Sequence, residues 1–503
     1  MKQENAVAKP STWAVIKTFP RALWCANIIE LFERWAYYGV RALLSLYIVD
    51  AAAKGGLEFN HVQKGSIYAW WALIQSLLPM FTGGYSDRYG YKKTMAVSWV
   101  LVIAGYLLMA TQRTYWGFFI GCMTLATGTA VFKPGVQGTI AHSLDDKHAA
   151  VGWGLFYQMV NIGGFIGPWV AGFLRLTSWR NVFYMSAFMI SLNYVMLLLY
   201  PDPKPKQTQD FTDANPLREF FKIFWNSVTN VLEPKLISFL LLFSGFWLMF
   251  MQLFDILPNY IDDWVDSSGV ILFLGRTLGV QKLITLGSNH VNIPPEWMVN
   301  LNAGMIILLM IPIAVLFSRF KALTSIIIGI FIAACGLVLA GSSMNGAVCI
   351  LGIFVFSVGE MASSPKKMEY LSSLAPPEKK GLYLGYANVP LAVGWAIGSK
   401  FGGYLYENFG DKTNLARRVL QTDFDMTAEA VRALPKQDIL PLLSQKMDLP
   451  ILELNRVLFE RFHPDRIWLC FACIGLASMA GLMVYDRVFV RRAAAKPALA
   501  LES

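Results

Sequence analysis

Residues 30–41 read Glu-Leu-Phe-Glu-Arg-Trp-Ala-Tyr-Tyr-Gly-Val-Arg, and this stretch decides how the chain must be arranged. It lies within an apolar run, 26–50, that is long enough to cross a bilayer, yet four of its residues are charged. The helical repeat places the polar residues on one face. This face carries Glu30, Glu33, Arg34, Tyr37, Tyr38 and Arg41. A charge at the centre of a membrane helix costs about 2.5–3.5 kcal/mol, so we predict that this face lines a polar cavity inside a helix bundle.

The composition indicates an all-α membrane protein. Of 503 residues, 55% are hydrophobic and only 15% are charged, which is too apolar for an ordinary soluble chain. The net charge of +10 is expected from basic loops on one side of a membrane and does not require nucleic acid. The six cysteines lie in or beside apolar runs, where small apolar side chains explain them better than a disulfide or a metal site.

Apolar runs of membrane-span length recur along the whole chain. We predict twelve spans, at about 24–50, 62–86, 94–112, 115–141, 151–175, 181–200, 235–261, 295–319, 323–342, 346–374, 380–406 and 465–488. Twelve spans place both termini on one side. Lysine and arginine concentrate in the connections on that side, so the positive-inside rule makes it cytoplasmic.

The spans fall into two groups of six. We predict an N-terminal half at 1–200, a cytoplasmic linker at 201–234 and a C-terminal half at 235–503. Within the linker, 217–225 has the pattern of an amphipathic helix lying on the membrane surface.

The loops on the other side of the membrane are poorer in basic residues. The short ones are predicted to include Lys54 and Lys64. Two long loops, at about 262–294 and 407–464, are predicted to lie outside the cytoplasm, and the helical patterns in 407–464 indicate a small helical cap. All five histidines fall in loops or at span ends, where we expect solvated side chains rather than proton relays: His61, His142, His148, His290 and His463.

The loop after the second predicted span, 83–93, reads Gly-Gly-Tyr-Ser-Asp-Arg-Tyr-Gly-Tyr-Lys-Lys. It resembles the loop signature of the major facilitator superfamily, GxxxDRxGxKK. In such a loop, glycine allows close helix packing, and Asp87 and Arg88 can join a charge network at the inner surface. We therefore expect Asp87 and Arg88 to have gating or structural roles.

Four further motifs resemble those of proton-dependent oligopeptide transporters, a family within that superfamily. The stretch 30–39 resembles ExxER(F)xYYG, with tryptophan replacing the usual phenylalanine. The other three are Gly128-Thr-Ala-Val-Phe-Lys133-Pro134, Phe156-Tyr-Gln-Met-Val-Asn161-Ile-Gly163, and Gly359-Glu360-Met-Ala-Ser-Ser364-Pro365. Trp247 and Asn302 resemble weaker landmarks of spans seven and eight. The resemblance covers most of the membrane region and implies the major facilitator fold.

The resemblance also implies roles for individual residues. The substrate carboxylate would face Arg34, Arg41 and Lys133, whereas the amino end and peptide backbone would face Asn161, Asn302 and Glu360. The predicted substrate site is completed by Tyr37, Tyr38, Tyr68, Trp247 and Ser364. Proton coupling is assigned to Glu30, Glu33, Lys133 and Glu360. Other interpretations stay open: helix packing for the tyrosines, and hydrogen bonds between helices for Asn161 and Asn302.

The charges predicted inside the membrane balance. The acids are Glu30, Glu33 and Glu360, and the bases are Arg34, Arg41 and Lys133. Protonating one carboxylate leaves a cation unpaired and changes which ion pairs persist, which is how a proton can drive a two-state bundle. Static structural pairs are the alternative.

The sequence departs from the family pattern around the expected pocket. Span seven has no acid directly before Gln252, so we predict that Asp255, one turn further on, pairs with Arg41. Span eleven has no tryptophan near Tyr386-Ala387-Asn388, and Lys366 and Lys367 stand where small or apolar residues are usual.

These features predict a symporter that imports di- and tripeptides or peptide-like molecules with protons by alternating access. A transporter of another small zwitterion or anion, such as an amino-acid conjugate or nitrate, is one alternative. A non-transporting membrane sensor or scaffold is another. We expect no enzymatic activity, no cofactor besides the coupling proton, no metal and no nucleic-acid partner. We expect an integral protein of the plasma membrane, specifically a bacterial inner membrane, that is a monomer in the lipid bilayer.

Overall fold

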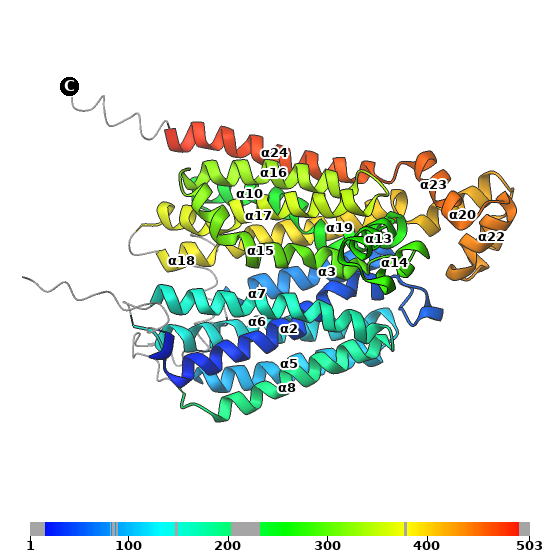
Figure 1. Ribbon diagram of the computed structural model, residues 1–503. Helices are drawn as coiled ribbons and strands as arrows, with labels where there is room; N and C mark the ends of the chain where they lie inside the picture. The colour runs from blue at the N-terminus through cyan, green and yellow to red at the C-terminus, as the bar shows by residue number, and fades with distance from the viewer. Residues whose placement is uncertain are drawn as a thin grey trace, which may run out of the picture.

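The computed structural model describes residues 16–80, 82, 86, 89–145, 149–202, 232–376 and 380–491. Long helices run side by side along one axis, and a group of short helices projects from one end (Figure 1). The first long helix begins, and the last one ends, at the opposite end (Figure 1). We call these the cap end and the termini end.

The predicted order of spans is confirmed, and the helices form two six-helix halves. The first half contains α2 (Arg21–Tyr47), α3 (His61–Leu77), α5 (Tyr91–Thr111), α6 (Tyr115–His142), α7 (Ala149–Arg175) and α8 (Trp179–Leu198). The second contains α10 (Pro234–Phe250), α11 (Gln252–Asp255), α12 (Leu257–Trp264), α15 (Pro295–Phe317), α16 (Ala322–Gly341), α17 (Gly346–Leu374), α18 (Lys380–Gly385), α19 (Asn388–Phe409) and α24 (Arg466–Tyr485). The predicted amphipathic helix at 217–225 lies outside the described residues.

Eight helices in the described part have both the length and the hydropathy of a membrane span, so the protein is an integral membrane protein. The remaining predicted spans contain α2, α3, α7 and α19. α2 packs against α7, and α3 packs against α19 across the two halves. At the second contact, a Cβ on Gly65 would lie 2.3 Å from the carbonyl oxygen of Ser399, so glycine is required there. α3 is shorter than a full span, with 17 residues, and the other three carry charged, polar or small residues that lower their hydropathy.

Span seven is broken into three pieces. α10 ends at Phe250, the single turn α11 follows, and α12 begins after Ile256 with Pro258 in its first turn. Irregular backbone inside a membrane protein persists where side chains satisfy its polar groups. Here the carbonyl oxygen of Asp255 accepts a hydrogen bond from Lys64 in α3, at 2.9 Å.

The two long loops are helical. The first contains α13 (Ser268–Leu278) and α14 (Gln281–Ser288), and the second contains α20 (Lys412–Thr422), α21 (Ala428–Ala433), α22 (Ile439–Met447) and α23 (Ile451–Phe462). Residues 412–462 form the cap, and the predicted helical character of this loop is confirmed. The cap buries a small apolar core of its own, made by Leu415, Val419, Ile439, Leu443, Leu454 and Leu458.

Candidate functional site

A cavity of about 350 Å³ lies between the two halves, and we call it the central cavity. Most of its lining comes from α2, α7, α10, α15, α17 and α19. The predicted residues in the lining are Arg34, Tyr37, Tyr38, Arg41, Asn161, Trp247, Asn302 and Glu360. The polar face of α2 therefore lines a cavity inside the bundle, as the spacing of its charges predicts.

A four-charge network lies in the first half beside the central cavity, and of its members Arg34 lines the cavity. Glu30 accepts a bond of 2.5 Å from Nζ of Lys133, and Nε of Arg34 lies 3.3 Å from the same oxygen. Arg34 also pairs with Glu33. Glu30, Glu33 and Arg34 are almost fully buried, at 0%, 2% and 5% exposure. Two acids and two bases thus neutralise one another, with Lys133 partly exposed and the other three buried, as burial of charges requires.

Arg34 also contacts the neighbouring tyrosines. Its guanidinium carbon lies 4.8 Å from the ring centre of Tyr37 and 5.6 Å from that of Tyr38. The hydroxyl of Tyr37 is hydrogen-bonded to the side chain of Gln75 on α3, at 3.1 Å. These contacts hold one planar cation at the cavity surface, where it can bind a carboxylate with two parallel hydrogen bonds.

The opposite wall carries a single acid held by neutral groups. Asn302 on α15 donates to a carboxylate oxygen of Glu360 on α17, at 2.8 Å, and to the hydroxyl of Ser357, at 3.0 Å. Asn302 therefore does join two helices. Asn161 donates within its own helix, to the carbonyl oxygen of Tyr157 at 2.9 Å. Behind this wall, Nζ of Lys367 lies 4.4 Å from the ring centre of Trp247.

At the cap end of the central cavity, Arg41 on α2 forms a buried ion pair with Asp255 on α11, as predicted. Asp255 also accepts hydrogen bonds from the hydroxyl of Ser399, at 2.6 Å, and from the indole of Trp395, at 3.1 Å. The guanidinium of Arg41 lies 4.3 Å from the ring centre of Tyr68. Partners on both sides of the interface thus fix this pair, which we call the gate pair.

Lys64 extends the gate pair toward the cap end. Its Nζ donates to Asn259 Oδ1 at 2.6 Å and to the carbonyl oxygen of Asp255. The prediction that Lys64 lies in a loop is wrong, because α3 begins at His61 and the side chain is 1% exposed. The charge count is corrected as well, since Asp255 and Lys64 add one acid and one base to the buried set.

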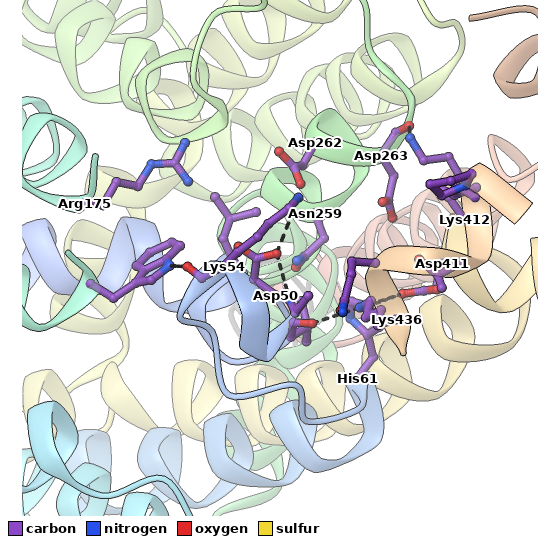
Figure 2. Close-up of a pocket in the computed structure, with 18 of the residues that line it drawn as sticks. Asp50, Lys54, His61, Arg175, Asn259, Asp262, Asp263, Asp411, Lys412 and Lys436 are labelled. Atoms are coloured by element: carbon purple, nitrogen blue, oxygen red, sulfur yellow. Dashed lines mark hydrogen bonds and ion pairs between the residues drawn. The ribbon is translucent and has the colours of Figure 1, made fainter. Parts of the chain in front are cut away.

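His61 is a further contact between the halves (Figure 2). Its Nε2 lies 3.1 Å from Asp411 at the start of the cap, and its backbone N–H donates to Glu407 at 2.7 Å. The expectation of a solvated His61 is wrong, since the side chain is buried. Burial opposes the ionisation of Asp411, but His61 and Lys436 hold its pKa below the usual range. With the gate pair and Lys64, this contact closes the interface at the cap end.

Some predicted residues do not line the central cavity. Tyr68 is buried against the guanidinium of Arg41, and Lys133 donates a hydrogen bond to Glu30. The hydroxyl of Ser364 is buried without a partner among the described residues, and it lies outside the lining. Asp87 and Arg88 are not among the described residues, so their predicted roles are untested.

The structure adds lining residues that the sequence analysis did not assign, among them Gln75, Tyr157 and Trp395. No tryptophan lies near Tyr386-Ala387-Asn388, but Trp395, seven residues after Asn388, lines the cavity from the same span. Seven residues are two helical turns, so the helical repeat placed Trp395 on the same face. For Lys64, the sequence Asn60-His-Val-Gln63 was an available signal, because it forms a capping box that fixes the start of α3.

Comparison with known sequences gives one family and several relatives. The profile of the Major Facilitator Superfamily matches residues 23–399. The uncharacterized transporter YclF of Bacillus subtilis is 30% identical over 161 residues, which are 31% of this chain and 32% of YclF. The di-/tripeptide transporter of Lactococcus lactis is 29% identical over 164 residues, 31% and 33% of the two chains. The multidrug resistance protein MdtH of Cronobacter sakazakii is 22% identical over 375 residues, 74% and 83% of the two.

Solved structures share the fold. A peptide transporter POT in complex with sulfate superposes with a TM-score of 0.65 at 17% identity, covering 94% of this chain and 95% of the other. The nucleoside transporter NupG gives a TM-score of 0.64 at 11% identity, with coverages of 92% and 99%. At such identities the likeness establishes the architecture. The class of substrate has to be argued from the side chains of the central cavity.

Proposed function

Because this chain belongs to the Major Facilitator Superfamily, we propose that it imports di- and tripeptides or peptide-like molecules by alternating access. The arrangement of charge in the central cavity carries this proposal. Arg34 and Arg41 line one wall, and Glu360 with Asn302 lines the other. A small peptide has a carboxylate at one end and an ammonium group at the other. The two walls offer a guanidinium for the first and a carboxylate for the second.

We propose that protons drive this import through Glu30, Glu33 and Lys133. In the structure, Arg34 is shared between both glutamates and therefore is only partly available to a substrate carboxylate. Protonating Glu33 removes its ion pair with Arg34, so that Arg34 can bind the substrate carboxylate. When the substrate leaves, Glu33 loses its proton and recaptures Arg34. Proton and substrate binding thus favour each other, which is the requirement for symport.

Alternating access also requires a conformation that is open at the cap end, and the gate pair controls it. Arg41 and Asp255 close the cap end here, so opening that end requires this pair to separate. Arg41 Nη1 has no partner among the described residues, and the residue lines the central cavity. A bound carboxylate can therefore compete with Asp255 for Arg41 and weaken the closed state.

We place the termini end in the cytoplasm and the protein, as a monomer, in a bacterial inner membrane. The support is the predicted excess of lysine and arginine in the connections on the side of the termini. The cap would then lie outside the cytoplasm. The likeness to the Lactococcus lactis di-/tripeptide transporter supports the peptide class of substrate.

Multidrug export is a second candidate. The match to MdtH extends over more of this chain than the match to the di-/tripeptide transporter. The central cavity also has apolar lining, including Phe250, Phe254 and Ile306. Four buried charges beside this lining favour a charged peptide over a lipophilic drug, because an apolar ligand would leave the charges with no new partner.

The test is uptake of labelled L-alanyl-L-alanine into proteoliposomes with an imposed inward proton gradient. We expect gradient-driven uptake by the wild type. The Glu33→Gln variant should lose gradient-driven uptake and retain exchange of internal for external peptide. Glu58→Gln, at an exposed residue, is the matched control. Uptake insensitive to the gradient would refute proton coupling. Ethidium export without peptide uptake would favour the second candidate, and uptake of another small zwitterion unaffected by excess dipeptide would change the substrate class.

A further inference from the structure

A second cavity, of about 650 Å³, lies at the cap end, and we call it the outer cavity (Figure 2). Its walls come from α12, from the segment after α2 and from the cap. Within the described part of the chain, it shares no lining residue with the central cavity. Its volume is in the range of pockets that bind small molecules.

Charges of both signs face the outer cavity (Figure 2). Asp262 on α12 is exposed and forms no hydrogen bond or ion pair with the described residues. Lys412, the first residue of α20, donates to the carbonyl oxygen of Asp263, which leaves its other N–H groups available. Lys436 donates to the carbonyl oxygen of Val49 at 2.8 Å and lies 3.9 Å from a carboxylate oxygen of Asp411, which leaves one of its three N–H groups without a hydrogen bond or ion pair among the described residues. The other charged lining residues each have a hydrogen bond or ion pair: Asp50, Lys54, Asp263, Asp411 and Arg175. Asp262, Lys412 and Lys436 are therefore the groups that can bind a charged ligand.

His61 gives the outer cavity a buried polar group as well. The residue lines this cavity and is 2% exposed. While Nε2 is paired with Asp411, Nδ1 is buried without a partner in the described part of the chain. Buried polar atoms are usually hydrogen-bonded, so Nδ1 is a further polar group available at the lining of this cavity.

We propose that the outer cavity is a second binding site for a zwitterion of dipeptide size. The ligand's ammonium group binds Asp262, and its carboxylate binds Lys412 and Lys436. The same pair of end groups is required by the central cavity, so this inference rests on the proposed function and extends it. The outer site holds the substrate at the cap end before the gate pair separates.

The outer cavity is connected to the gate pair through two residues, Asn259 and Lys64. Asn259 lies in its lining, accepts the hydrogen bond from Lys64 and donates to the carbonyl oxygen of Ser45 at 2.9 Å. Lys64 in turn binds the carbonyl oxygen of Asp255. A ligand that approaches Asn259 therefore meets the group that positions Lys64 against the gate pair.

The test is equilibrium dialysis of labelled L-alanyl-L-alanine against the purified full-length protein in detergent. We expect two peptides per chain at saturation in the wild type. Asp262→Asn, at an exposed and unpaired residue, should weaken one site about tenfold, as should Lys412→Met; loss of one charge-assisted contact has this size. Asn302→Ala should weaken the other site. Glu453→Gln, at an exposed acid of the cap away from the outer cavity, should change neither.

One peptide per chain in the wild type, unaffected by Asp262→Asn and lost in Asn302→Ala, would overturn the outer site and leave the proposed function standing. Two peptides per chain, of which Asn302→Ala removes neither, would instead contradict the central site. Acetylating the peptide's amino group removes the ammonium charge and so tests the role of Asp262 without a variant at that residue. If the acetylated peptide still occupies a site that Lys412→Met weakens, the role of Asp262 is wrong.

Discussion

The acids on the two sides of the central cavity have different kinds of partner. On the wall from the first half, Glu30 and Glu33 are paired with Arg34 and Lys133. On the opposite wall, the hydrogen-bonded partner of Glu360 is the neutral amide of Asn302. Among the described residues, the first wall pairs its carboxylates directly with cations of the same half, whereas Glu360 has no direct ion pair and Lys367 of the same helix acts on it at longer range.

This difference separates two tasks. A closed set of charges responds to a proton by exchanging partners, because removing one charge leaves an unpaired one that must find another. A carboxylate held by a neutral donor, with Lys367 acting on it only at longer range, has no direct ion pair to break, so a cation from outside can bind it directly. The first wall is therefore suited to coupling and the second to binding the ammonium end of a substrate.

The largest effect is expected from removing the cation of the first wall. Lys133→Met leaves Glu30 buried with Arg34 as its remaining partner, and Arg34 is already shared with Glu33. Breaking a buried charge pair costs about 3–5 kcal/mol, so gradient-driven uptake should fall at least about a hundredfold. Uptake into proteoliposomes measures this, with Lys446→Met in the cap as the control. Uptake near the wild-type rate would show that the four-charge network is only structural.

The gate pair lies between the walls and should show the next largest effect. Arg41→Asp and Asp255→Arg each place like charges together, and each should reduce uptake more than about tenfold. The double exchange restores one positive and one negative charge. Uptake should then recover to within about threefold of the wild type, as expected for a direct coupling measured by a double-mutant cycle. If the double variant is as inactive as the single variants, the pair does not act as a gate.

The second wall should show a smaller and more selective effect. Glu360→Gln keeps the hydrogen-bonding shape but loses the charge. It should raise the KM for dipeptides with a free amino group about tenfold, the size of one charge-assisted contact. Inhibition by N-acetylated peptides should not change. Glu369→Gln, at an exposed acid of α17, is the control. An equal loss for both peptide types would show that Glu360 has a role beyond binding the ammonium group.

The sequence predicted the fold and the two walls better than the cap end. Charges inside an apolar run must face protein, so the helical repeat alone placed Glu30 and Arg34 on the inner face of α2, where Arg34 lines the cavity and Glu30 is buried beside it. The pairing of Arg41 with Asp255 followed from the resemblance, because the acid usual before Gln252 is missing and Asp255 lies one helical turn further on. The contacts of Lys64 and His61 depend on where α3 begins and on how the cap folds back. The cap has no counterpart in the motifs that carried the resemblance, and its docking on the bundle is a matter of tertiary packing.

The smallest effect concerns the cap, where charges are exposed and water screens them. Hydrogen bonds from Arg461 and Thr422 lower the pKa of Asp423 to about 2, from an ordinary value of 3.8. The folded pKa lies below the unfolded one, so this contact stabilises the cap above about pH 4 and is lost as the pH falls toward 2. Exchange of backbone amides in α20 and α23 should therefore become slightly faster over this interval. Asp423→Asn should remove the pH dependence and leave exchange in α2 unchanged. An unaltered pH dependence in this variant would assign it to Asp411, whose pKa is also lowered and whose pairing with His61 ties the cap to the bundle.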